Sequence, residues 1–115
     1  VIIIAGTIEL DPTRRDTALT TAKPYIDGAL TQDGCEAYTW SADLSSPGRV
    51  EVFERWTSEA DLAAHFAGPH YHAMLKALGA FGLKSSEVSK YRVDHREPVY
   101  DSDGKPRADF FTEIP

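Results

Sequence analysis

The sequence has few of the features that mark a disulfide-stabilised, nucleic-acid-binding or membrane-spanning chain. Its one cysteine, Cys35, cannot form an internal disulfide, which is compatible with a reducing compartment, and the cytoplasm is the default expectation. Lys and Arg number 12 against 18 Asp and Glu, and the net charge of −6 opposes binding to polyanionic nucleic acid. The apolar run at residues 1–5 is too short to span a bilayer. We therefore expect neither nucleic acid nor membrane as a partner.

The first half of the chain predicts a strand, a helix and a hairpin. "VIIIAGTIEL" (1–10) is rich in β-branched residues and apolar on both alternations, which is typical of a strand covered on both sides. "DP" at 11–12 predicts an N-cap and a first helical position, and that helix should end before "QDG". Residues 35–44 and 49–57 are strand-like and flank "SSPG", which suits an antiparallel hairpin.

The second half predicts two short helices and a last strand. "SEAD" (58–61) matches a capping signature, and Gly68 with Pro69 should end one helix and start another. Residues 85–95 return to strand periodicity. The order β-α-β-β-α-β, with the second helical region broken in two, indicates a ferredoxin-like α+β domain. Its antiparallel sheet of four strands has helices on one side.

The helix-free face of this sheet would be an exposed apolar patch in a monomer. The first strand is apolar both ways, and the third offers Val52 and Trp56 on one alternation and Phe53 on the other. We therefore expect a homodimer.

A family resemblance follows from these residues. The stretch from "GCEAYTW" through "SPGRVEVFERWTSEADLAAHFAGPHYHAML" resembles the antibiotic biosynthesis monooxygenase family, with its Gly-Cys-x-x-Tyr strand, Glu-x-Trp strand end and helix bearing two histidines. The resemblance implies a domain at 1–96 that forms a dimeric α+β barrel, with a pocket between each sheet and its helices. It further implies oxidation of an aromatic quinol or polyketide by O2 without metal, flavin or haem.

Two departures limit what the resemblance implies. The chain has no asparagine, so it lacks the pocket Asn of the haem-degrading branch and of some polyketide oxygenases. Residues 97–115 extend beyond the usual end of the fold. Phe110 and Phe111 in this extension should pack on the same subunit or on its neighbour. "DSDGKP" (101–106) is interpreted as a turn, because a calcium loop would need its Gly later and a bidentate Glu.

Histidine is the expected general base, because its pKa lies near working pH. His65 borders the apolar face of its helix and is the first candidate. His70, at the start of the next helix, should be neutral and is the second. A structural role for His65, bonded to a backbone carbonyl or to Glu54, remains open. A metal site is disfavoured because His70 and His72 diverge on a helix, although His65 and His70 with Glu54 stay geometrically possible.

Aromatic side chains on neighbouring strands and helices could stack on a flat substrate, although packing in the core or at the dimer interface is the alternative. Tyr91 is favoured over Arg92, since the two point to opposite faces. The substrate-binding candidates are Tyr38, Trp40, Glu54, Trp56, Phe66, Tyr71, Met74 and Tyr91. Two other functions remain open on the same barrel: a non-catalytic aromatic-binding or stress-response domain, and an isomerase or lyase that needs no oxygen.

Overall fold

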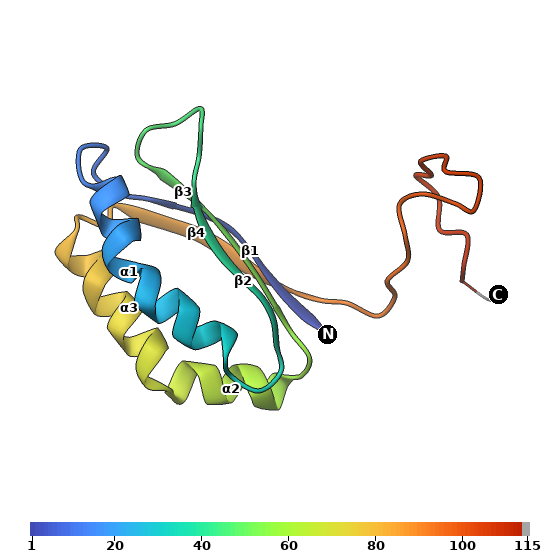
Figure 1. The fold of residues 1–115 in the computed structure, drawn as a ribbon, viewed down its shortest axis with the longest axis horizontal. Coiled ribbons are helices and arrows are strands. Elements are labelled where there is room, and N and C mark those ends of the chain that lie inside the picture. Colours follow the sequence, from blue (N-terminus) through green and yellow to red (C-terminus); the bar gives the residue numbers. More distant parts are fainter. Residues whose placement is uncertain (114–115) are drawn as a thin grey trace.

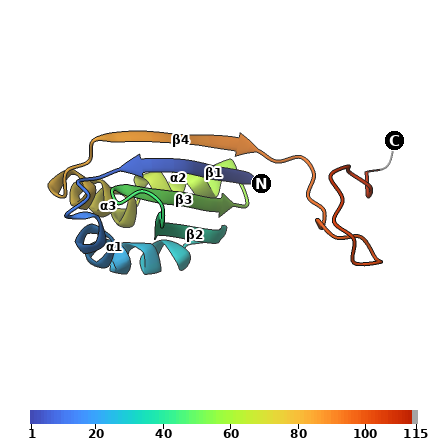
Figure 2. The ribbon, with the colours of Figure 1, turned by 90° about the horizontal axis from the view of Figure 1, so that it is seen from above.

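A computed structural model describes residues 1–113 as a curved sheet with three helices on one side (Figure 1). Seen from above, the helices form a second layer against the sheet (Figure 2). No helix within residues 1–113 is long and apolar enough to cross a membrane. The elements are β1 (Ile2–Glu9), α1 (Arg15–Leu30), β2 (Cys35–Ala42), β3 (Arg49–Trp56), α2 (Glu59–Ala67), α3 (Pro69–Ala80) and β4 (Ser85–Arg92).

The sheet is antiparallel throughout, with the strand order β2-β3-β1-β4. Its central strands are β3 and β1, and Ile4 on β1 pairs with Glu54 on one side and Lys90 on the other. This order and the one-sided helix layer confirm the ferredoxin-like α+β prediction.

Alternation along the strands separates the two faces as the sequence indicated. Ile4, Ile8, Val50 and Trp56 are buried under the helices. On the opposite face, Phe53 keeps 38% of its surface exposed because no element of the same chain covers it. Glu51 and Arg55 share this face of β3, so the expected apolar patch is present but interrupted by charged residues.

Helix α1 starts later than "DP" predicted. The Asp11 carboxylate accepts hydrogen bonds from the backbone and hydroxyl of Thr13, two residues on, and thereby closes a separate turn. The continuous helix begins only at Arg15, after a cap residue, Arg14, that makes no side-chain capping bond. By contrast, the Ser58 hydroxyl accepts from the Asp61 N–H and caps α2 as predicted.

The loop between β2 and β3 is longer than the predicted four-residue turn. Strand β2 ends at Ala42, and Asp43 then turns the chain by accepting hydrogen bonds from the backbone N–H groups of Ser45 and Ser46. Leu44, which the strand pattern included, is fully exposed in this loop.

The C-terminal segment leaves the sheet and runs away from it (Figures 1 and 2). It folds around Glu97, whose side chain is only 5% exposed and accepts hydrogen bonds from the backbone N–H groups of Phe111 and Thr112. Burial alone would raise the pKa of Glu97, but these bonds and one from His95 lower it to about 2. Within residues 97–113 the segment thus has its own polar centre.

Candidate functional site

A cavity of about 460 Å³, here called the central cavity, lies between the sheet and the two shorter helices. Strand alternation places Glu54, Val52 and Ile4 on its floor, while α2 and α3 supply the facing wall. The cavity is largely apolar, which is typical of small-molecule sites. Its lining residues are Ile4, Ile8, Trp40, Val52, Glu54, Phe66, Tyr71, Leu75, Leu78, Leu83, Ser86, Val88, Ser89 and Lys90.

Glu54 is the carboxyl group of the central cavity. It is 5% exposed, and its Oε1 accepts a hydrogen bond of 3.0 Å from the Trp56 indole. Burial raises its pKa, and the Trp56 and Trp40 N–H groups oppose this rise only in part. The sequence left His65 open as a partner of this carboxyl. Instead, Trp56 bonds it, and Arg55 pairs with Glu36.

The Trp40 indole N–H is buried and has no hydrogen-bond partner among residues 1–113. Trp40 lines the central cavity from β2 and lies near enough to Glu54 to lower that residue's pKa, without forming a hydrogen bond to it. A buried donor left without a partner costs free energy. Burial raises the pKa of Tyr38 and the Trp40 N–H opposes this rise, so the Glu54 carboxyl and the Tyr38 hydroxyl are polar groups near this donor. The nitrogen itself is buried away from the cavity surface.

His65 lies one layer behind the cavity wall. It is 1% exposed, and its Nδ1 is 2.7 Å from the Gln32 side-chain oxygen. Its ring packs 4.6 Å from Trp56, centroid to centroid. Burial, with a smaller contribution from His70, lowers its pKa to about 4, so the imidazole is neutral at neutral pH. Neither Glu54 nor a backbone carbonyl bonds it; Gln32 does.

His70 and His72 lie outside the central cavity. The His70 ring packs against Gly28 of α1 so closely that a Cβ atom at position 28 would collide with it. It therefore joins α3 to α1, whereas His72 is exposed. No group of three or more His, Cys, Asp or Glu side chains in the described part of the chain is placed to hold a metal ion.

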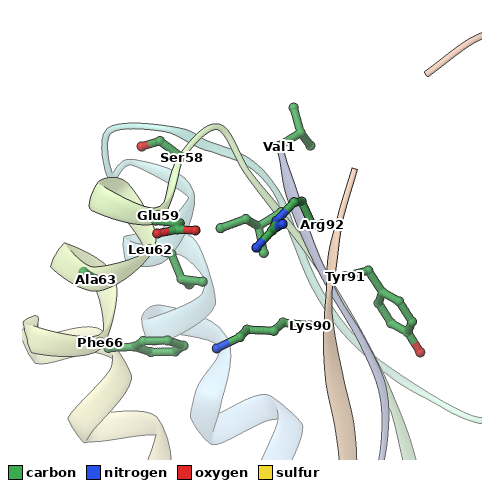
Figure 3. Close-up of a pocket in the computed structure, with 10 residues that line it drawn as sticks. Val1, Ser58, Glu59, Leu62, Ala63, Phe66, Lys90, Tyr91 and Arg92 are labelled. Carbon is green, nitrogen blue, oxygen red and sulfur yellow. The ribbon is translucent and has the colours of Figure 1, made fainter. Parts of the chain in front are cut away.

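The remaining candidates fall into three groups. Trp40, Glu54, Phe66 and Tyr71 come together around the central cavity. Tyr38, which is 4% exposed, packs with Trp56 and His65 in an aromatic layer behind it. Two candidates lie away from both groups. Met74 is 2% exposed and belongs to the core. The ring of Tyr91 points to the opposite face of the sheet (Figure 3).

A second hollow of about 590 Å³, here called the end hollow, lies between α2 and the ends of β1 and β4 (Figure 3). Lys90 and Arg92 extend into it, so the alternation of β4 directs Arg92 rather than Tyr91 toward the helices. The sequence pattern favoured Tyr91 over Arg92 and did not indicate Lys90. The signal was available, because positions 86, 88, 90 and 92 share the phase that pairs with the buried face of β1.

Comparison with known proteins connects this architecture to a family. The antibiotic biosynthesis monooxygenase family matches the chain over residues 1–77. An uncharacterized protein from Synechocystis sp. is 24% identical over 92 residues, which are 80% of this chain and 63% of that protein. The chain therefore spans less than two thirds of the length of that relative.

Solved structures show the same fold. A candidate antibiotic biosynthesis monooxygenase from Deinococcus radiodurans has a TM-score of 0.79 and 21% identity, covering 88% of this chain and all of that one (100%). A conserved protein from Methanosarcina mazei Go1 has a TM-score of 0.71 and 23% identity, covering 79% and 90%. Identities this low support the fold alone. With the family match over residues 1–77, the chain belongs to the antibiotic biosynthesis monooxygenase family.

Proposed function

We propose that the protein is a cofactor-independent monooxygenase that oxidises an aromatic quinol or polyketide-type substrate with O2 in the central cavity. One observation carries the proposal: a carboxyl group, Glu54, lines an apolar cavity beside the unpartnered N–H of Trp40. The rings of Phe66 and Tyr71, which lie 5.0 Å apart between centroids, offer a flat substrate an aromatic wall.

Glu54 is the proposed base, in preference to His65 and His70, because it alone of the three lines the central cavity. Its raised pKa makes the carboxylate a stronger base than an exposed one. It would accept the proton that a phenol or anthrone loses, and the resulting anion would reduce O2. In an anthrone, one oxygen atom becomes the new carbonyl and the other leaves as water. The N–H groups of Trp56 and Trp40 would hold the Glu54 carboxylate in place.

The test is oxygen consumption with a panel of naphthohydroquinones and anthrones. Glu54→Gln keeps an acceptor for the Trp56 N–H but removes the base, so we expect kcat to fall by about 10²- to 10⁴-fold. Glu51→Gln is the matched control, since it removes an exposed carboxylate from the same strand. His65→Gln tests the histidine directly. If His65→Gln lowers kcat as much as Glu54→Gln does, the His65 imidazole and not Glu54 is the base.

Two outcomes would favour the alternative functions. A wild-type protein that binds these aromatics without accelerating their oxidation over the spontaneous rate would be a ligand-binding domain. Turnover at the same rate in anaerobic buffer would indicate an isomerase or lyase.

We further propose a homodimer that packs through the open face of the sheet, with the 97–115 extension reaching the neighbouring subunit. Phe53 and Tyr91 keep 38% and 54% of their surfaces exposed on that face, and Phe110 keeps 64% in the extension.

The homodimer can be tested with one substitution and one truncation. Phe53→Arg should shift the protein toward monomer in light scattering. Removal of residues 97–115 should weaken the dimer, and an unchanged dimer and stability would contradict the role of the extension.

A further inference from the structure

The end hollow contains two cationic side chains that have no ionic partner among residues 1–113. Lys90 and Arg92 occupy alternate positions of β4, so both extend to the helix side, toward α2 (Figure 3). Neither forms a salt bridge with any residue of the described chain. The chain as a whole has a net charge of −6, so a concave site with two cations outside any salt bridge differs in sign from the rest of the molecule.

The charged side chains that line the end hollow have a positive net charge. Glu59, at the start of α2, is the one carboxylate among the lining residues, so the balance of Lys90, Arg92 and Glu59 is a single positive charge. The N-terminal end of α2 adds a small positive potential on the same side. An anionic group is the ligand chemistry that this balance favours.

The end hollow and the central cavity share two of their lining residues. Phe66 and Lys90 line both sites, and their side chains extend toward one another from opposite walls (Figure 3). A ligand with its rings in the central cavity would pass between these two side chains to reach Arg92. Lysine also protects edge strands from unwanted pairing, but here Lys90 turns toward the helices instead of outward along the edge.

We propose that Lys90 and Arg92 form an anion-binding subsite, and that the substrate is an aromatic compound with a carboxylate on a short side chain. The location of the rings rests on the proposed function, whereas the anion subsite rests on the end hollow itself. Arg92 would bind the carboxylate through its planar guanidinium, and Lys90 would contribute a point charge at the passage between the two sites. The carboxylate thereby sets substrate specificity and the orientation of the rings.

The experiment compares naphthalene acetic and propionic acids with their neutral amides by isothermal titration calorimetry. We expect the acids to bind the wild-type protein about tenfold more tightly than the amides at low salt. Lys90→Gln with Arg92→Gln should reduce this ratio to about one, by weakening the binding of the acids far more than that of the amides. Glu59→Gln should shift the ratio the other way, because it removes the opposing carboxylate.

The matched control is Lys23→Gln with Lys76→Gln, which removes the same net charge from exposed helix positions and should leave the ratio intact. Since both subsite cations are exposed, the preference for the acids should shrink between about 20 mM and about 500 mM NaCl. Equal affinity for acids and amides, an equal loss of both in the double variant, or no measurable binding of the acids overturns the proposal.

Binding is measured here without turnover, which separates this proposal from the proposed function. Selective binding of the acids by a protein that consumes no oxygen would refute the oxygenase alone. Oxygen consumption with no preference for acids would refute the anion subsite alone.

Discussion

Strands β3 and β4 belong to the same sheet, yet they meet the helix layer in opposite ways. On β3, Val50 and Trp56 are completely buried and Val52 is 4% exposed. On β4, all eight residues are exposed, including those on the helix side. The helix layer therefore covers the region around β3, here called the closed half of the sheet, and leaves the region around β4, here called the open half, incompletely covered.

The difference follows from the residues on the helices. Helix α1 turns the small residues Ala18, Ala22 and Ala29 inward, so its backbone can approach the sheet closely. Helices α2 and α3 carry larger side chains that are incompletely covered, such as Phe66 at 40% and Leu75 at 46% exposure. The closed half thus supplies the packing that stabilises the fold. The central cavity lies where the two halves meet, with Val52 and Glu54 from the closed half and Val88 and Lys90 from the open half.

The largest expected effect separates two leucines of α3 that both line the central cavity. Leu78 is 4% exposed and Leu75 is 46% exposed. We expect Leu78→Ala to lower the free energy of unfolding by about 2–4 kcal/mol and Leu75→Ala by less than about 1 kcal/mol. Urea denaturation measures both. Similar losses for the two variants would show that the closed and open halves contribute equally to stability.

The next effect concerns His65, behind the closed half. Its pKa is about 4 in the folded protein against about 6.5 when unfolded, so between these values the unfolded chain binds the extra proton. Its contribution to stability is therefore complete above pH 6.5 and is lost as the pH falls toward 4. We expect a loss of about 1–2 kcal/mol across this window that is missing in His65→Gln. The control is His72→Gln, which replaces an exposed histidine and should keep the same loss of stability as the pH falls.

A smaller effect of opposite sign is expected from Glu54. Because burial raises its pKa in the folded state, the folded protein holds the proton more tightly, and ionisation at higher pH destabilises the fold. Glu54→Gln should therefore gain stability relative to wild type as the pH rises above 4.5, and lose this advantage in acid. The gain is limited because the Trp56 hydrogen bond offsets part of the cost of burying the charge. A variant that is equally stabilised at all pH values would contradict the role of ionisation.

The sequence predicted the fold well because each signal that mattered was local. Strand alternation, the Ser58 cap and the break at Gly68 act within a few residues, and all three are present. The site was predicted only in part. Whether an aromatic ring or a histidine lines a cavity or lies one layer behind it depends on contacts between distant residues, such as Gln32 with His65. The pattern therefore identified Glu54 and Trp40 as candidates but could not separate them from Tyr38 and Trp56.

The smallest effect is expected for a valine of the open half, compared with a valine of the closed half. Val52 on β3 is 4% exposed and Val88 on β4 is 36% exposed, and both line the central cavity. Threonine keeps the shape of valine but introduces a hydroxyl that must be solvated or bonded. We expect Val52→Thr to cost about 1–2 kcal/mol and Val88→Thr to stay within about 0.5 kcal/mol. If Val88→Thr nevertheless weakens binding of an aromatic ligand in calorimetry, the open half serves recognition while contributing little to stability. An unchanged affinity would place the ligand away from β4.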